Sequence, residues 1–177
     1  MDTLDEIGLH KMPTQQAMAL DTEITPEDIT EAIRSLATCR FARSSCPSGW
    51  FFYRANCYGY FQTPRSWPEA EFECQDQGVE AHLASILDDT EASIIAPHIA
   101  AQRETPSVWI GVHDPQRNQR WKWIDGSKYD YTAWYAGQPD NFNGAEHCGQ
   151  LVKSEGFLKW NDSGCHELHP FLCKYKR

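Results

Sequence analysis

Two short triplets and one glutamate within residues 138–162 supply five oxygen-bearing side chains whose types suit the binding of a hard cation. The set consists of two amides and three carboxylates: Gln138, Asp140, Glu146, Asn161 and Asp162. Calcium is the best candidate, because it takes roughly six to eight oxygen ligands in a flexible geometry. Magnesium requires a tighter octahedron and keeps its waters, and zinc would require His or Cys ligands.

Two triplets bracket this stretch, Gln-Pro-Asp at 138–140 and Trp-Asn-Asp at 160–162. A cis bond before Pro139 would turn the carbonyl groups of its two neighbours towards one point. The cis form costs only about 0.5–1 kcal/mol before proline, so we expect Pro139 to be cis. Either triplet alone would be an ordinary polar turn. Both together, with Glu146 two residues before Cys148 between them, favour a metal site.

The composition excludes several classes of partner. The formal net charge of −9 argues against nucleic acid or an anionic membrane as the main partner. The sequence has no run of about 18 apolar residues, so we expect no insertion into a membrane.

Apolar residues make up 41% of the chain and supply a packed core. The seven cysteines indicate an oxidising compartment if they pair; six lie within 46–173 and Cys39 is left over.

Residues 1–45 are predicted to be an N-terminal extension, disordered up to Thr22, with a short helix over 25–38. Thr25 suits the N-cap and Pro26 the first turn. One side of this helix would be apolar, with Ile29, Ile33 and Leu36. The first residues lack the basic and apolar regions of a secretory signal. Since the cysteines indicate secretion, we expect the signal peptide to be missing from this sequence.

Residues 46–177 are predicted to form one mixed domain. Ser66-Trp67-Pro68-Glu69 is a capping box with proline in the first turn, which predicts a helix to about Gln77 with Gly78 as its stop. A second helix should begin at Asp88 or Asp89 and bend or end at Pro97. Strands are predicted at 50–54, 56–61, 107–112, 121–124, 149–152, 157–160 and 171–175. Residues 127–145 have no clear period, and loops of that length are usually functional.

Taken together, these motifs resemble a C-type lectin domain, with Gln-Pro-Asp as its galactose-type motif and Trp-Asn-Asp as its second calcium motif. The resemblance covers residues 46–173 and includes further landmarks at 81–85, 109–112 and 131–134. Residues 57–61 and 109–114 are most similar to regenerating-islet (Reg) proteins, type IV especially. The short Gln-Pro-Asp loop is more similar to the galactose-binding C-type lectins of snake venoms.

The resemblance implies an α+β fold of the C-type lectin-like class, stapled by disulfides. Two helices, two small antiparallel sheets and a long calcium-binding loop are expected. Six cysteines allow fifteen pairings, and spacing alone does not choose among them. The resemblance selects Cys46–Cys57, Cys74–Cys173 and Cys148–Cys165.

The function implied is that of a secreted, extracellular lectin, not an enzyme. All five ligands of the Ca²⁺ ion would also contact the sugar, whose vicinal hydroxyls coordinate the ion. Phe142 is the candidate for the apolar face of galactose, although it could instead pack on the loop. The expected partners are galactose-type glycans on glycoproteins, glycolipids or microbial surfaces. The alternative is a lectin-like fold used for protein or mineral contact without sugar binding, as in the eggshell proteins that the chain also resembles.

Other motifs carry less weight. In the family's auxiliary calcium site only Asp114 is retained, and Asn118, Asn141 and His147 stand at the other acidic positions, so we expect one calcium ion. The histidines of Cys165–His169 are three residues apart rather than four, which argues against a zinc protease. The glycosylation acceptor at 161–163 contains a predicted calcium ligand, so we expect it to be unmodified.

Cys39 lies outside the predicted domain, seven residues before Cys46. A leftover cysteine in a secreted chain suggests an intermolecular bond or a free thiol. A disulfide-linked homodimer would hold two weak sugar sites on one molecule and raise avidity. The alternative is that Cys39 has no role.

Overall fold

The computed structural model describes residues 25–31, 33, 46–102 and 104–177. The chain divides into two compact units, Met1–Cys39 and Arg40–Arg177. In the first unit, residues 26–31 and 33 are helical. Thr25 caps this helix as expected, because its Oγ1 accepts the N–H of Asp28 at 3.2 Å. The expected continuation to residue 38, the disorder up to Thr22 and the role of Cys39 lie outside the described residues.

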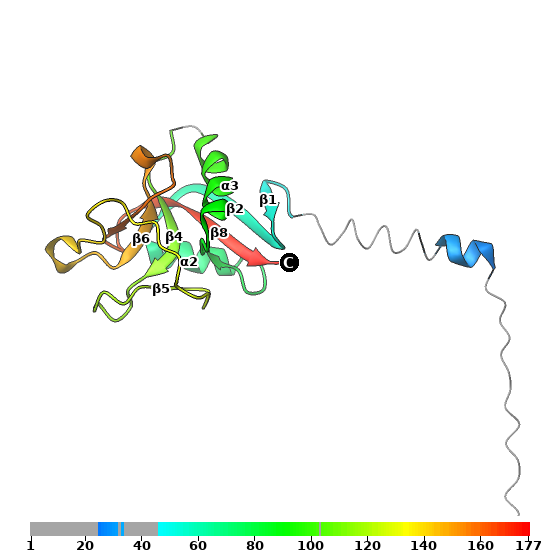
Figure 1. The fold of residues 1–177 in the computed structure, drawn as a ribbon, viewed down its shortest axis with the longest axis horizontal. Coiled ribbons are helices and arrows are strands. Elements are labelled where there is room, and N and C mark those ends of the chain that lie inside the picture. The colour runs from blue at the N-terminus through cyan, green and yellow to red at the C-terminus, as the bar shows by residue number, and fades with distance from the viewer. Residues whose placement is uncertain (1–24, 32, 34–45, 103) are drawn as a thin grey trace, which may run out of the picture. The chain divides into compact units, whose positions relative to one another are not determined.

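The described part of the second unit contains two α-helices and eight strands in one sheet (Figure 1). The helices are α2 (Trp67–Gln75) and α3 (Asp89–Ala100), and two 3-10 turns are η1 (Phe142–Gly144) and η2 (Lys153–Glu155). The strands are β1 (Trp50–Tyr53), β2 (Asn56–Arg65), β3 (His82–Leu83), β4 (Val108–His113), β5 (Lys122–Trp123), β6 (Cys148–Leu151), β7 (Trp160–Ser163) and β8 (His169–Lys176). The expected α+β architecture is therefore confirmed.

The sheet has the order β1-β2-β8-β4-β6-β7, with β3 beside β8 and β5 beside β4. All of its pairings are antiparallel except that of β4 with β8, which is parallel at Trp109 and Phe171. The expectation of two separate antiparallel sheets was wrong on this point. The apolar strand β4 is buried on both faces and pairs along both edges, so it joins the two halves into one mixed sheet.

Both helices begin as their sequences predict. The Glu69 carboxylate accepts the N–H and the hydroxyl of Ser66 at 3.0 and 2.6 Å, and Asp88 accepts the N–H of Glu91 at 2.8 Å. The helix ends were predicted less well. Helix α2 stops at Gln75, and the left-handed residue beyond it is Glu80 (φ 57°) rather than Gly78. Helix α3 continues past Pro97 to Ala100, so it does not end at the proline.

The strand predicted at 157–160 was wrong. Phe157 has φ 62° and follows the turn at η2, and strand β7 begins only at Trp160. The apolar side chain of Phe157 is 4% exposed and packs in the core from a turn, which mimics the pattern of a buried strand. The correction places residues 161 and 162 inside β7, beside β6.

Three disulfides staple the domain with the expected pairing. Cys74–Cys173 joins α2 to β8 across 99 residues of sequence, with a Cα–Cα distance of 5.4 Å. Its neighbourhood is one of two hydrophobic clusters, built on Trp67, Trp109 and Phe171. The other cluster lies between α3 and the sheet and includes Trp123 and Trp160.

A buried ion pair connects α3 to β8. The ammonium of Lys174 donates to Glu91 at 2.7 Å and to the backbone and hydroxyl oxygens of Ser85, both at 3.1 Å. The hydroxyl of Tyr58 also donates to Glu91. Burial raises the pKa of Tyr58, and the bonded carboxylate raises it further. Tyr58 therefore stays a protonated donor to Glu91.

We predict that Glu91→Ala lowers the free energy of unfolding by about 3–5 kcal/mol, because it leaves the Lys174 ammonium buried without its counter-ion. Urea denaturation monitored by Trp fluorescence measures the loss. Lys128→Ala is the control, since the Lys128–Asp130 pair is exposed and should contribute nothing measurable. Equal midpoints for wild type and Glu91→Ala would contradict a stabilising role for the buried pair.

Candidate metal centre

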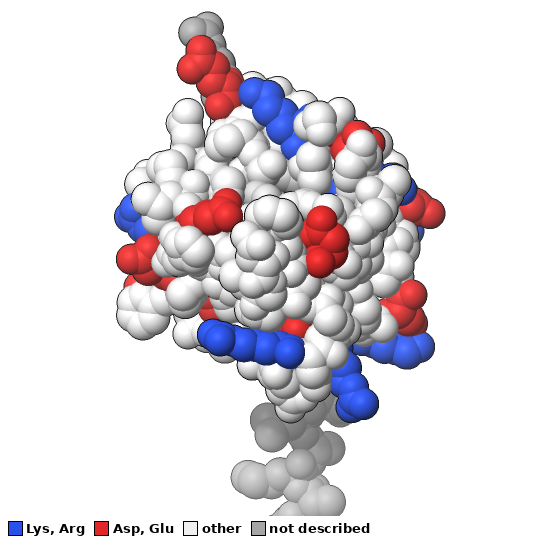
Figure 2. Space-filling view, turned by 90° about the vertical axis from the view of Figure 1, so that its left-hand side faces the viewer, with Lys and Arg blue, Asp and Glu red and all other residues white. Residues whose placement is uncertain are grey.

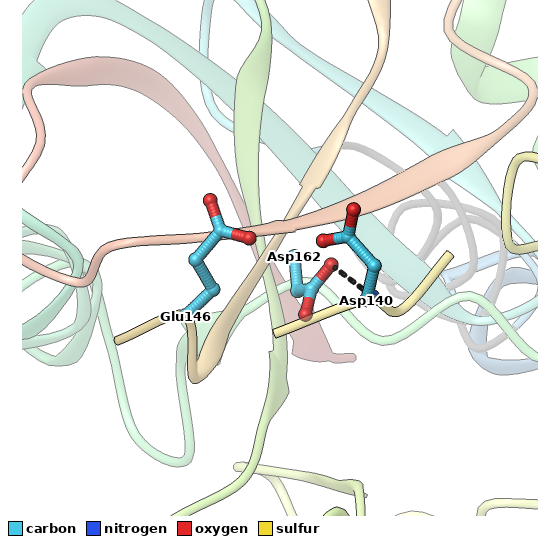
Figure 3. Close-up of side chains that lie close together, drawn as sticks. All are labelled: Asp140, Glu146 and Asp162. Atoms are coloured by element: carbon cyan, nitrogen blue, oxygen red, sulfur yellow. Dashed lines mark hydrogen bonds between the residues drawn. The ribbon is translucent and has the colours of Figure 1, made fainter. Parts of the chain in front are cut away.

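Three carboxylates converge at the end of the sheet formed by β6 and β7. Oxygen atoms of Asp140, Glu146 and Asp162 all lie within 4.8 Å of one another (Figure 3). This is the only such group of metal-ligating side chains among the residues that the structure describes. Asp140 is exposed, Glu146 is half-buried and Asp162 is fully buried, so the group has an open side and a buried floor.

Strand β7 positions the floor of the site. Asp162 pairs with Gly149 of β6, where an added Cβ would lie 2.1 Å from the Val112 side chain. This strand pair can therefore approach β4 closely only with glycine at that position. The Asp162 carboxylate accepts the N–H of Asp140 at 3.2 Å and that of Asn141 at 2.8 Å. These two bonds fasten the Gln-Pro-Asp loop to the sheet.

The loop returns on itself between Asp140 and Glu146. The Gln138–Pro139 bond is cis, as predicted. Asn141 is left-handed (φ 48°), and its Oδ1 accepts the N–H of Glu146 at 3.2 Å. The Glu146 carboxylate accepts the N–H of Phe142 at 3.0 Å. These bonds bring the Glu146 carboxylate back towards Asp140, as Figure 3 shows.

The two amides of the predicted ligand set lie at the edges of this group. Gln138 Oε1 accepts the N–H of Asp140 at 3.1 Å, and Asn161 Nδ2 donates to the backbone carbonyl of Asp162. Asn161 thus lies beside a backbone oxygen that could serve as a further ligand. The structure therefore brings the three carboxylates together directly and places the amides against the backbone next to them.

The electrostatics of the group favour a cation. Burial raises the pKa of Glu146, and the negative charges of Asp162 and Asp140 raise it further, against the Phe142 N–H, which lowers it. A divalent ion among these oxygens would remove the repulsion that the raised pKa reports. The donors are all oxygens of carboxylates, amides and backbone, which fits calcium better than zinc.

Phe142 stands at the tip of the loop, in η1, with 64% of its surface exposed. It belongs to neither hydrophobic cluster of the described residues. The alternative that Phe142 packs on the loop is therefore not favoured, and the aromatic ring is free to contact a ligand.

The retained acid of the auxiliary site has a structural use. Asp114 is buried and accepts the N–H groups of Gln119 and Asn118 at 2.8 and 3.2 Å, and its carboxylate lies 3.5 Å from His147 Nδ1. Burial opposes ionisation of Asp114, but these partners outweigh it and lower its pKa.

Sequence reasoning treated Asn141 only as a lost acid and missed its bond to Glu146. The Asn-x-x-Gly pattern at 141–144 was the available signal, since both residues tolerate positive φ.

These features define a disulfide-stapled α+β domain in which three carboxylates converge on one group. Residues 63–175 match the family model described as Lectin C-type domain, and the chain belongs to that family. It is 46% identical over 134 residues to human "Regenerating islet-derived protein 4", covering 76% of this chain and 83% of that protein. It is 38% identical over 133 residues to "C-type lectin BfL-2" of Bungarus fasciatus, covering 75% and 84%.

A solved structure shows the same fold. Human lithostathine superimposes with a TM-score of 0.71 at 36% identity, covering 75% of this chain and all of that chain. The resemblance inferred from the sequence motifs is thus confirmed. Separately, none of the helices in the described ranges has the length and apolar character to cross a membrane.

Calcium affinity should fall as the pH falls from about 7 towards 4.5, because a proton on Glu146 removes one ligand charge. The usual pKa of this carboxyl is 4.5, and its folded value is raised, so the loss begins above pH 4.5. In EDTA, without calcium, the stability of the fold depends on pH in the opposite direction. The contribution of Glu146 is present below its ordinary pKa and is lost as pH rises through the raised value.

Calcium titration calorimetry across this range, with Glu146→Gln as the comparison, measures the effect. The variant should bind calcium more weakly at about pH 7, and its affinity should depend less on pH. An unchanged pH slope in Glu146→Gln would assign the proton competition to a different carboxylate.

Proposed function

We propose that this protein is a secreted lectin that binds galactose-type glycans through a calcium ion. The observation that carries the proposal is the convergence of Asp140, from the Gln-Pro-Asp loop, with Glu146 and Asp162. Gln138, Asn161 and the backbone carbonyl of Asp162 would complete the ligand set. The three disulfides support secretion, since such bonds persist in oxidising compartments.

The residues around the ion would select the sugar. Bound calcium would leave coordination positions for two vicinal hydroxyls. Carboxylates of the same site accept hydrogen bonds from those hydroxyls, and the amide N–H groups of Gln138 and Asn161 donate to them. The amide precedes Pro139 and the acid follows it, an order that resembles the galactose-type motif of the family, whereas Glu-Pro-Asn resembles the mannose type.

The surface around the site suits a neutral ligand. Figure 2 views the side of the domain that carries the loop at the left of Figure 1. Uncharged residues cover most of this face, and its acidic side chains are scattered rather than gathered in one patch. The exposed ring of Phe142 adds an apolar surface next to Asp140. Sugars present such a mixture of hydroxyls and apolar C–H faces.

The proposal predicts that wild type is retained on a galactose column with calcium and released by EDTA. Asp140→Ala should lose retention, because it removes one of three carboxylates from an exposed loop without touching the core. Asp130→Ala is the matched control, since Asp130 is an exposed aspartate outside the site. Calcium-independent retention, or retention of Asp140→Ala equal to wild type, would contradict the role of the ion, and no retention of wild type with calcium would favour the alternative of protein or mineral contact.

A double change tests the sugar preference. Gln138→Glu with Asp140→Asn exchanges the amide and the acid around Pro139 and keeps the side-chain sizes close. Relative affinity should shift from galactose towards mannose, because the positions of donors and acceptors are reversed. Competition by free galactose and by free mannose against binding to a glycan array measures the ratio of the two affinities. A mannose preference in wild type would contradict the assignment.

The homodimer through Cys39 stays a proposal, since Cys39 lies outside the described residues. Non-reducing electrophoresis of wild type beside Cys39→Ser tests it directly. A monomer in both lanes would remove the dimer and leave the calcium site as it stands.

A further inference from the structure

Helix α2 presents an aromatic side chain to solvent and buries a carboxylate. Phe72 is 67% exposed, whereas the neighbouring Glu71 is 6% exposed. Glu71 is held inside by the N–H of Leu83 at 2.9 Å, by Gln75 Nε2 at 2.7 Å and by a 2.6 Å contact with His82. The fold therefore explains Glu71. Phe72 belongs to neither hydrophobic cluster of the described residues, so packing of the domain does not account for it.

Two open hollows lie against α2. One hollow of about 570 Å³ is lined by Arg65, Pro68, Glu69, Phe72, Glu73 and Asp76. A second, of about 510 Å³, is lined by Ser66, Pro68, Glu69, Cys165, His166 and Leu168. The two share Pro68 and Glu69 and form one surface, which we call the α2 groove. Each half has an exposed apolar side chain, Phe72 in the first and Leu168 (63% exposed) in the second.

The charge of the α2 groove is acidic. Glu69, Glu73 and Asp76 line it, and the only Lys or Arg among its lining residues, Arg65, is paired with Glu73 at 2.9 Å. Hydrogen bonds from the hydroxyl and the N–H of Ser66 lower the pKa of Glu69, which keeps it ionised. The whole chain carries −9. A second copy of this acidic chain or an anionic membrane would meet repulsion here, and a basic partner would meet attraction.

We propose that the α2 groove binds a short segment of a partner protein in which Lys or Arg side chains flank apolar ones. The apolar side chains would cover Phe72 and Leu168, and the cations would lie against Glu69 and Asp76. From Ser66 to Asp76 the helix spans roughly 15 Å, which matches about three turns of a partner helix. This surface lies on α2 and on residues 165–168, whereas the three candidate metal ligands come from the 138–146 loop and from β7.

The test uses a fluorescent synthetic helical peptide with Leu on one face and Lys on both flanks of that face. Binding is measured by anisotropy with the full chain in EDTA, so that the calcium site plays no part. A scrambled peptide and one with Glu in place of every Lys are the peptide controls. The variants are Phe72→Ser, Leu168→Ser and Asp76→Asn, and Val79→Ser is the matched control, since Val79 is 88% exposed and lines neither hollow.

Wild type and Val79→Ser should bind the Lys peptide alike, and Phe72→Ser should weaken binding about tenfold, as expected for a central anchor. Leu168→Ser and Asp76→Asn should weaken it less, and added salt should weaken binding to wild type. Equal affinity of Phe72→Ser and wild type, equal losses in Val79→Ser and Phe72→Ser, or tight binding of the Glu or scrambled peptide overturns the proposal. Self-association through the groove, seen as a sedimentation shift that Phe72→Ser abolishes, overturns it as well.

Discussion

The pairing of β4 along both of its edges is the constraint on which the rest of the domain depends. On one side β4 meets β8 in parallel at Trp109 and Phe171, and on the other it meets β6 antiparallel. The β8 side carries the β2 hairpin and the disulfide to α2. The β6 side carries β7 and the acidic site, which is the group of Asp140, Glu146 and Asp162. Strand β4 is buried on both faces and paired along both edges. A polar substitution within β4 would therefore destabilise both halves of the sheet.

The acidic site illustrates how backbone bonds can hold like charges together. Three carboxylates within 4.8 Å repel one another, and the pKa of Glu146 is raised as a result of its burial and of that repulsion. Asp162 nevertheless accepts two loop N–H groups, and Glu146 accepts a third. Hydrogen bonds to charged groups contribute about 1.5–3 kcal/mol each, enough to offset part of the repulsion. The loop is thus ordered by the same oxygens that a cation would use, which reduces the conformational entropy that binding must remove.

Sequence reasoning succeeded where a residue type has one strong physical preference. The capping box at Ser66 fixed the start of α2, the bond before Pro139 is cis, and the family resemblance selected the right cysteine pairs. It failed where a pattern has two physical readings. Phe157 is apolar and buried, but it packs from a turn, and periodicity does not distinguish this from a short strand. The joining of the sheet halves depends on a long-range parallel pairing at Trp109, for which no local signal exists.

The α2 groove and the acidic site are chemically different, although a short covalent path links them. Cys165 lines the groove and is bonded to Cys148, which lies two residues after Glu146, and the Cys165 carbonyl accepts the N–H of Trp67 at the start of α2. The groove combines apolar side chains with fixed negative charge, so its affinity must depend on salt. The proposed lectin site would instead bind through coordination of an ion and hydrogen bonds to sugar hydroxyls. The bonds that order the acidic loop come from β7 and from the loop itself. The bonds that order the loop do not involve the α2 groove, so the proposed glycan site and the proposed protein-binding surface are compatible with each other.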